Sequence, residues 1–121
     1  MELKEYQEQA MSTKMESCDN PLYMLFEISS EAGELHGKFA KAIRKGAIEF
    51  DGNNDFRSNM SAEDYADWFE DVVHELGDIL WGIAGLSEVI GTSLEQVAKM
   101  NLEKLASRKA RGVIEGNGDN R

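Results

Sequence analysis

Two pairs of carboxylates are spaced so that each pair could bind a divalent cation. Glu31 and Glu34 lie three residues apart, and so do Glu75 and Asp78. Residues at positions i and i+3 share one face of a helix, so each pair can direct its carboxylates toward one point. Oxygen ligands, without cysteine or histidine at metal spacing, favour Mg²⁺ over Zn²⁺, with Mn²⁺ as a substitute. These four residues are the candidate metal ligands.

The alternative is that they are ordinary solvated acids, because the chain has 23 Asp and Glu residues. Four carboxylates brought close together would repel one another and have raised pKa values unless cations join them. A non-catalytic, acidic helical interaction protein would account for the net charge of −10. It would not account for two spaced pairs followed by a basic helix.

Four helices must position these side chains. Asn20, Ser61 and Ser93 are typical N-cap residues, and Pro21 suits a first helical position. Gly46 and Gly91 are typical of helix ends. The expected helices cover residues 2–16, 21–45, 61–90 and 93–109, with a loop at 46–60 and an arm at 110–121.

Apolar residues recur at helical spacing within three of these helices and predict the core. At 100° per residue, both carboxylate pairs fall at the border of the apolar stripes, so packing the stripes together would bring the pairs to one rim. The residues predicted to face inward are Leu25, Ile28, Ala32, Leu35, Phe39 and Ile43, then Phe69, Val72, Val73, Leu76, Ile79, Leu80 and Ile83, and finally Leu94, Val97, Leu102 and Leu105.

Gly77, Gly82 and Gly85 stand inside the third expected helix. Each costs about 1 kcal/mol relative to alanine in a helix interior. Close approach of another helix is the expected compensation.

The amino-acid composition indicates the fold class and the location of the protein. The 121 residues fit one domain, and a single proline with 8% aromatic residues argues for an all-α fold. No apolar run reaches the roughly 20 residues of a membrane span, and the first residues do not resemble a signal peptide. Cys18 is the single cysteine, so no disulfide is expected and the cytoplasm is the expected location.

The charge is divided unevenly along the chain. Residues 1–98 carry seven basic and twenty acidic residues, a net charge of −13, whereas residues 99–121 carry six basic and three acidic residues, a net charge of +3. The acidic majority argues against nucleic acid as a partner. The basic end is suited to folding back on the body or to holding an anion.

The chain contains three motifs in order: EAGEL (31–35) followed by Lys41, ELGDILW (75–81), and NLEKLASR (101–108). Together they resemble the MazG-like all-α nucleoside triphosphate pyrophosphohydrolases. The resemblance covers about residues 22–121 and implies a four-helix bundle of the MazG type with an extended C-terminal arm, assembled as a dimer or tetramer. The 40 residues between Glu34 and Glu75 exceed the usual spacing, and the excess falls within residues 46–67.

The resemblance also implies an activity. The substrate would be a (deoxy)nucleoside triphosphate, cleaved between the α- and β-phosphates to a nucleoside monophosphate and pyrophosphate. Mg²⁺ would be held by Glu31, Glu34, Glu75 and Asp78, and Glu31 or Glu34 would accept the proton of the attacking water. The base and sugar preferences stay open. The candidate phosphate-binding residues are Lys41, Asn101, Lys104, Arg111 and Arg121.

Two features have more than one reading. Trp81 lies about 140° from its helix's apolar stripe, so it meets another helix, a subunit or a nucleobase. The tail RGVIEGNGDNR, similar to the end of some short phage and bacterial MazG-like proteins, is either a frayed terminus or an arm that closes over the triphosphate.

Overall fold

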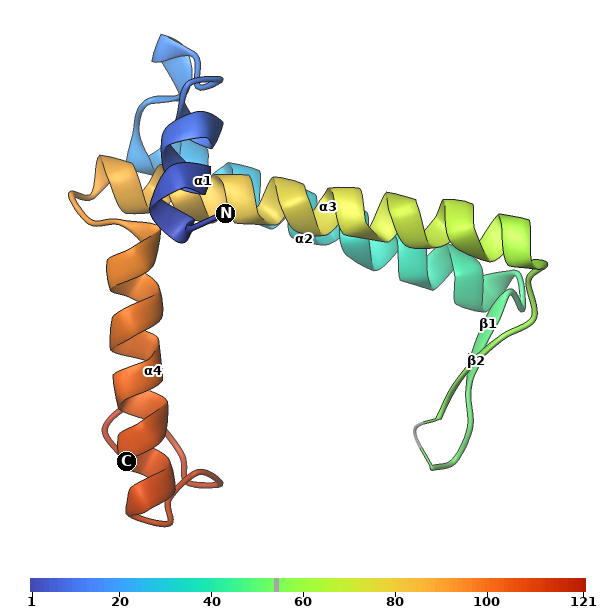
Figure 1. Ribbon diagram of the computed structural model, residues 1–121. Helices are drawn as coiled ribbons and strands as arrows, with labels where there is room; N and C mark the ends of the chain where they lie inside the picture. Colours follow the sequence, from blue (N-terminus) through green and yellow to red (C-terminus); the bar gives the residue numbers. More distant parts are fainter. Residues whose placement is uncertain (54) are drawn as a thin grey trace.

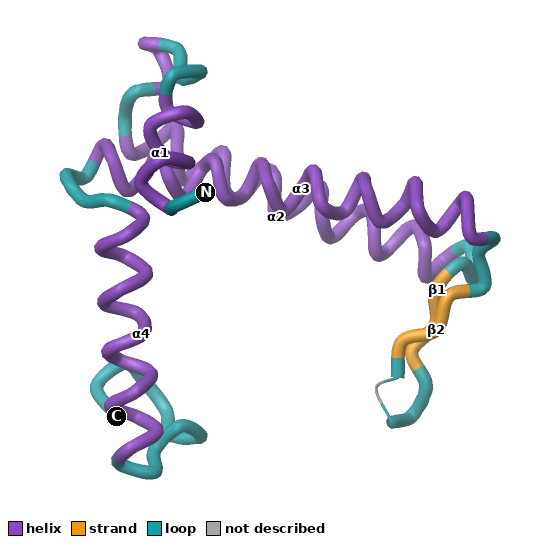
Figure 2. Tube along the Cα trace, in the orientation of Figure 1, coloured by secondary structure: helices purple, strands orange, loops and turns teal. Residues whose placement is uncertain are grey.

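The computed structural model describes residues 1–53 and 55–121 and consists mainly of helices (Figures 1 and 2). The all-α class and the four helices are confirmed. No helix among the described residues is long and apolar enough to cross a membrane. The elements are α1 (Leu3–Met11), a 3₁₀ turn (Glu16–Cys18), α2 (Pro21–Arg44), β1 (Ile48–Phe50), β2 (Phe56–Ser58), α3 (Ala62–Val89) and α4 (Leu94–Ala110).

The three predicted N-caps are confirmed, because in each case the cap side chain accepts a hydrogen bond from a main-chain N–H three residues later. Gly46 and Gly91 follow α2 and α3 with φ of 70° and 85°, the left-handed region that favours glycine. The cap bonds are Asn20 with Tyr23 (2.8 Å), Ser61 with Asp64 (3.1 Å) and Ser93 with Gln96 (3.1 Å).

Helices α2 and α3 run antiparallel along their lengths and form the body of the molecule (Figure 1). Two glycines of α3 let α2 approach closely. A Cβ at Gly82 would lie 2.8 Å from Ile28 Cγ1, and one at Gly85 would overlap the thioether of the fully buried Met24. The expected close approach is confirmed at these positions but not at Gly77, which has no such neighbour among the described residues.

Helix α1 is shorter than predicted, since it ends at Met11 rather than near residue 16. It crosses the end of the α2–α3 pair where α4 begins (Figure 1). Gln7 joins these elements: its side-chain amide donates to the Ala84 carbonyl (3.3 Å), and its side-chain oxygen accepts from the Leu94 N–H (2.9 Å).

Helix α4 projects away from the α2–α3 pair, so the four helices do not close around one core within a single chain (Figure 1). The inward prediction is wrong at many positions, because α4 leaves the α2–α3 pair instead of packing along it. Predicted core residues that are exposed are Leu25, Ile43, Phe69, Val73, Leu76, Leu80, Val97, Leu102 and Leu105.

The loop predicted at 46–60 is instead a β-hairpin that projects from the far end of the α2–α3 pair (Figure 2). Its two short strands pair antiparallel, with Glu49 opposite Arg57 and Phe50 opposite Phe56. The first pair forms a salt bridge, and the second makes an edge-to-face aromatic contact. Strands of three residues are too short to show a periodic pattern, which is why the sequence did not reveal them.

The arm after α4 is not extended but folds back on the end of that helix. Arg108 is 5% exposed and donates to the main-chain and side-chain oxygens of Asp119. Arg121 donates to the carbonyls of Val113 and Ile114, and so ties the end of the arm to its beginning.

Candidate functional site and family

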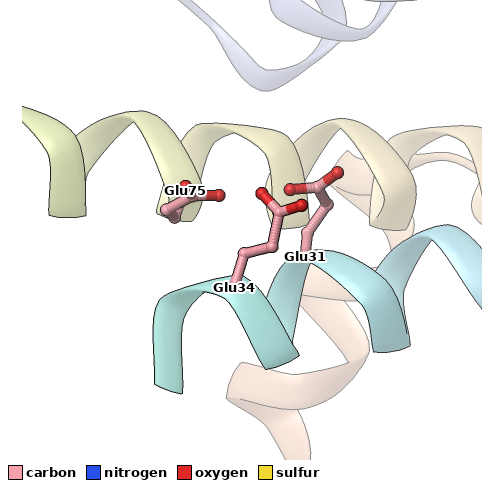
Figure 3. Close-up of side chains that lie close together, drawn as sticks. All are labelled: Glu31, Glu34 and Glu75. Atoms are coloured by element: carbon pink, nitrogen blue, oxygen red, sulfur yellow. The ribbon is translucent and has the colours of Figure 1, made fainter. Parts of the chain in front are cut away.

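Three carboxylates converge between α2 and α3. Glu31 and Glu34 lie one turn apart on α2 and point toward Glu75 on α3 (Figure 3). One oxygen from each residue lies within 4.8 Å of the others. The expected rim of carboxylates therefore forms for these three residues, which are called the carboxylate cluster below.

Glu75 has an incomplete set of partners. The residue is 8% exposed, and its buried Oε2 has no hydrogen-bond partner. Its Oε1 lies 3.8 Å from Nζ of Lys38, which is also 3.6 Å from Oδ2 of Asp71. A buried carboxylate oxygen without a partner carries a large desolvation cost, which a bound cation would remove.

Glu31 has a strongly shifted proton affinity. Partial burial, followed by the negative charges of Glu34, Glu27 and Asp78, raises the pKa of Glu31 to about 7. A hydrogen bond with Glu75 acts in the same direction. Mutual repulsion of this kind is expected where several carboxylates share a site meant for a cation.

Asp78 lies outside the group of oxygens that meet within 4.8 Å. It is nevertheless near, because its charge contributes to the raised pKa values of Glu31 and of Tyr6, the latter shifted mainly by burial. Its role as a metal ligand stays a prediction.

Lys41 lies beside the cluster. Together with Lys38 and Gly37 it lines a hollow of about 300 Å³ that also reaches Glu34 and Glu75. Lys38 is not among the candidate site residues predicted from the sequence. The signal was available, since Lys38 lies one turn after Glu34 and one turn before Lys41.

The four candidates on α4 and the arm do not meet the cluster within one chain, because α4 leaves the α2–α3 pair and carries the arm at its far end (Figure 1). Lys104 Nζ lies 3.8 Å from Asp119. Arg111 donates to the Ser107 hydroxyl (3.1 Å) and to the main-chain oxygen of Arg121 (2.6 Å). Asn101 is exposed.

Trp81 contacts α1. Its indole N–H donates to the Ala10 carbonyl (3.1 Å) and the Thr13 hydroxyl (3.0 Å). Of the readings left open by the sequence, packing against another helix is the one seen. A role of Trp81 in binding the substrate stays a prediction.

A family model for the MazG nucleotide pyrophosphohydrolase domain matches residues 19–113. The chain belongs to this family. The resemblance drawn from the three motifs is thereby confirmed, and with it the class of the molecule as a pyrophosphohydrolase domain.

Two curated relatives of this MazG domain are similar over much of their length. The Gene 37 protein of Mycobacterium phage L5 is 36% identical over 108 residues, which cover 88% of this chain and 81% of the relative. The uncharacterized protein YvdC of Bacillus subtilis strain 168 is 33% identical over 81 residues, covering 67% of this chain and 68% of the relative. No solved structure matches the chain significantly.

The residues of this MazG domain fit a divalent cation. The donor set consists of carboxylate oxygens alone, which suits Mg²⁺ or Mn²⁺. Within the cluster, Glu75 Oε2 is buried and lacks a partner, and the pKa of Glu31 is raised first by burial and then by the neighbouring carboxylates.

Proposed function

We propose that this chain is a Mg²⁺-dependent nucleotide pyrophosphohydrolase. It cleaves (deoxy)nucleoside triphosphates between the α- and β-phosphates and releases a nucleoside monophosphate and pyrophosphate. Glu31, Glu34, Glu75 and Asp78 hold the metal, and Mn²⁺ serves as a substitute.

One observation carries this proposal: a buried carboxylate oxygen without a partner stands among three converging carboxylates and beside lysines. The unpartnered atom is Oε2 of Glu75. Lys38 and Lys41 line the adjoining hollow and bring positive charge to the same place. A triphosphate needs both elements, because its own negative charge must be neutralised before water can attack.

The chain's residues divide the reaction between them. When bound, Mg²⁺ neutralises the triphosphate and lowers the pKa of the attacking water. Glu31 or Glu34 accepts the proton as the water oxygen bonds to the α-phosphorus and the bond to the oxygen bridging to the β-phosphorus breaks. Lys38 and Lys41 orient the phosphates by their charge.

The active unit in this proposal is a dimer or tetramer. Apolar side chains are exposed along α2, α3 and α4, and a monomer would leave them in contact with water. Association would cover them, and would let α4 of one chain bring Asn101, Lys104, Arg111 and Arg121 to the cluster of another. We place the protein in the cytoplasm of a bacterial or phage-infected cell, as one domain over residues 1–121.

Product analysis tests the function directly. The protein is incubated with a panel of nucleoside and deoxynucleoside triphosphates with Mg²⁺, with Mn²⁺ or with a chelator. The expected products are a nucleoside monophosphate and pyrophosphate, formed only with metal. Release of a nucleoside diphosphate and inorganic phosphate would contradict the proposed bond, and no turnover of any nucleotide would contradict the activity.

A further inference from the structure

A second hollow adjoins the carboxylate cluster and has a different lining. It has a volume of about 290 Å³ and shares Lys38 and Lys41 with the hollow at the cluster. Its remaining lining consists of four apolar or aromatic side chains, a lysine and an aspartate: Ala42, Ala47, Met60, Trp68, Lys45 and Asp71. The two hollows are therefore neighbours along the same stretch of α2.

The indole of Trp68 is held firmly in place. Phe56 of the hairpin stacks on it with ring centroids 6.0 Å apart, and Phe39 of α2 meets it in edge-to-face geometry at 5.1 Å. Tyr65 contacts it from one turn earlier on α3. Ordering an aromatic ring in advance reduces the entropy lost when a ligand binds against it.

The distance from the cluster suits a nucleotide. Trp68 precedes Glu75 by seven residues, which is about two turns or roughly 10 Å along α3. On α2, Lys38 and Lys41 occupy the turns that lead from the cluster toward the same hollow. A ligand with one end at the cluster and the other at the indole would pass these two ammonium groups.

The lining points to a nucleoside rather than to a phosphate alone. An inorganic phosphate chain would use the lysines but would gain nothing from Met60, the alanines or the indole. A base has an aromatic face for the indole and an apolar surface for Met60, and base–aromatic contacts tolerate any base. Lys45 and Asp71 can meet the polar edge of a base or the sugar hydroxyls.

We propose that this hollow, named the indole site, binds the nucleoside part of the substrate, with the base against Trp68 and the phosphates directed past Lys38 and Lys41 to the carboxylate cluster. The assignment rests on the proposed function for its substrate. It adds Trp68 as a residue that recognises the base. Trp68 lies two turns from Glu75 on α3, and Phe56 of the hairpin stacks on it.

Indole fluorescence tests the site without turnover. The chain has two tryptophans, and the variant Trp68→Phe keeps an aromatic ring while removing the reporter. The four deoxynucleoside monophosphates are titrated with Mg²⁺ present, and inorganic pyrophosphate serves as the probe without a base. We expect saturable quenching by at least one monophosphate in the wild type, none with pyrophosphate, and loss of the signal in Trp68→Phe.

Kinetics supplies the second measurement. Trp68→Leu should raise KM for the preferred triphosphate at least tenfold with a smaller change in kcat, whereas Trp68→Phe should retain most of the affinity. Phe50→Leu is the matched control, because Phe50 is 52% exposed, belongs to the same group of aromatic contacts and does not line the hollow. Far-UV circular dichroism verifies that each variant is folded.

The outcomes separate the two proposals. Quenching by monophosphates without hydrolysis of any triphosphate would retain the indole site and reject the activity. Hydrolysis without quenching, or quenching that persists in Trp68→Phe, would overturn the indole site. Quenching by pyrophosphate to the same extent as by monophosphates would also overturn it, because the hollow would then hold phosphates.

Discussion

Lys38 and Glu75 face each other across the interface of α2 and α3, with Nζ 3.8 Å from Oε1, while the second oxygen of Glu75 is buried and unpartnered. The ammonium group of Lys38 therefore faces one oxygen of Glu75, and the other oxygen is free to bind a cation. Since Lys38 also lies 3.6 Å from Asp71, its ammonium group compensates the charge of two carboxylates on α3.

Replacing Lys38 should make folding more dependent on metal. In Lys38→Met, Glu75 keeps its burial but loses its cation, so the melting temperature without metal should fall by several degrees. Added Mg²⁺ should raise the melting temperature more in the variant than in the wild type. Lys45→Met is the control, since the described structure gives Lys45 no salt bridge. Equal shifts with Mg²⁺ in both proteins would argue against a cation at Glu75.

Removing a single carboxylate of the cluster should abolish hydrolysis without unfolding the chain. Glu34→Gln and Glu75→Gln each remove a proposed metal ligand and also remove repulsion, so stability without metal should stay the same or rise slightly. We expect pyrophosphate release to fall at least about 100-fold. Glu70→Gln is the matched control on α3, because that side chain is 70% exposed. Near-normal turnover in both cluster variants would reject the metal ligands.

The stability of the metal-free protein should depend on pH through Glu31. Its pKa is raised from 4.5 to about 7 on folding, so the folded state binds the proton more tightly than the unfolded state between those values. The free energy of unfolding should therefore decrease as pH rises from 4.5 to 7. Thermal melts from pH 5 to 8 should show a smaller slope in Glu31→Gln than in the wild type. An unchanged slope would contradict this origin of the pH dependence.

Association of chains should depend on the exposed apolar side chains of α4. Leu102 is 66% exposed in the single chain, and Leu102→Asp should shift the mass measured by light scattering toward the 13.5 kDa monomer. Glu103→Gln, at the next exposed position, should leave the mass unchanged. A wild-type monomer at micromolar concentrations would contradict the proposed oligomer.

Deleting residues 111–121 should weaken catalysis more than stability. The arm supplies Arg111 and Arg121, and its contacts with α4 are mostly polar, so little apolar surface is lost. We expect kcat/KM to fall at least about tenfold, or roughly 1.4 kcal/mol of transition-state binding. The melting temperature without nucleotide should change little. Full activity of the truncated protein would show that the arm serves neither substrate binding nor closure.

The starts of α2, α3 and α4 could be predicted because they depend on local chemistry, whereas the end of α1 was predicted wrongly. Asn20, Ser61 and Ser93 each satisfy a free N–H of the helix that follows, and no distant residue is involved. The three carboxylates of the cluster were predicted for a related reason, since their spacing on each helix and the apolar stripes together determine which side faces the other helix.

Other features depend on partners that are distant in sequence. The hairpin is stabilised by Phe56 against Trp68, a contact that no local pattern reveals. The ion pair of Lys38 with Glu75, 37 residues away, could not be read from local spacing, although the position of Lys38 one turn after Glu34 could have marked it as a candidate. The exposure of Leu76 and Leu102 could not be predicted, because periodicity identifies an apolar face without showing whether another element packs against it.

The hairpin between α2 and α3 has a consequence for how such a protein can diversify. Ala47 and Met60 flank the hairpin and line the indole site. The carboxylates of the cluster lie instead within α2 and α3. Substitution or exchange of residues 47–60 would alter the surface offered to a base and leave the metal ligands in place. If the indole site binds the base as proposed, changes in residues 47–60 would alter part of the base-binding surface, while Trp68 and the carboxylates stay on α2 and α3.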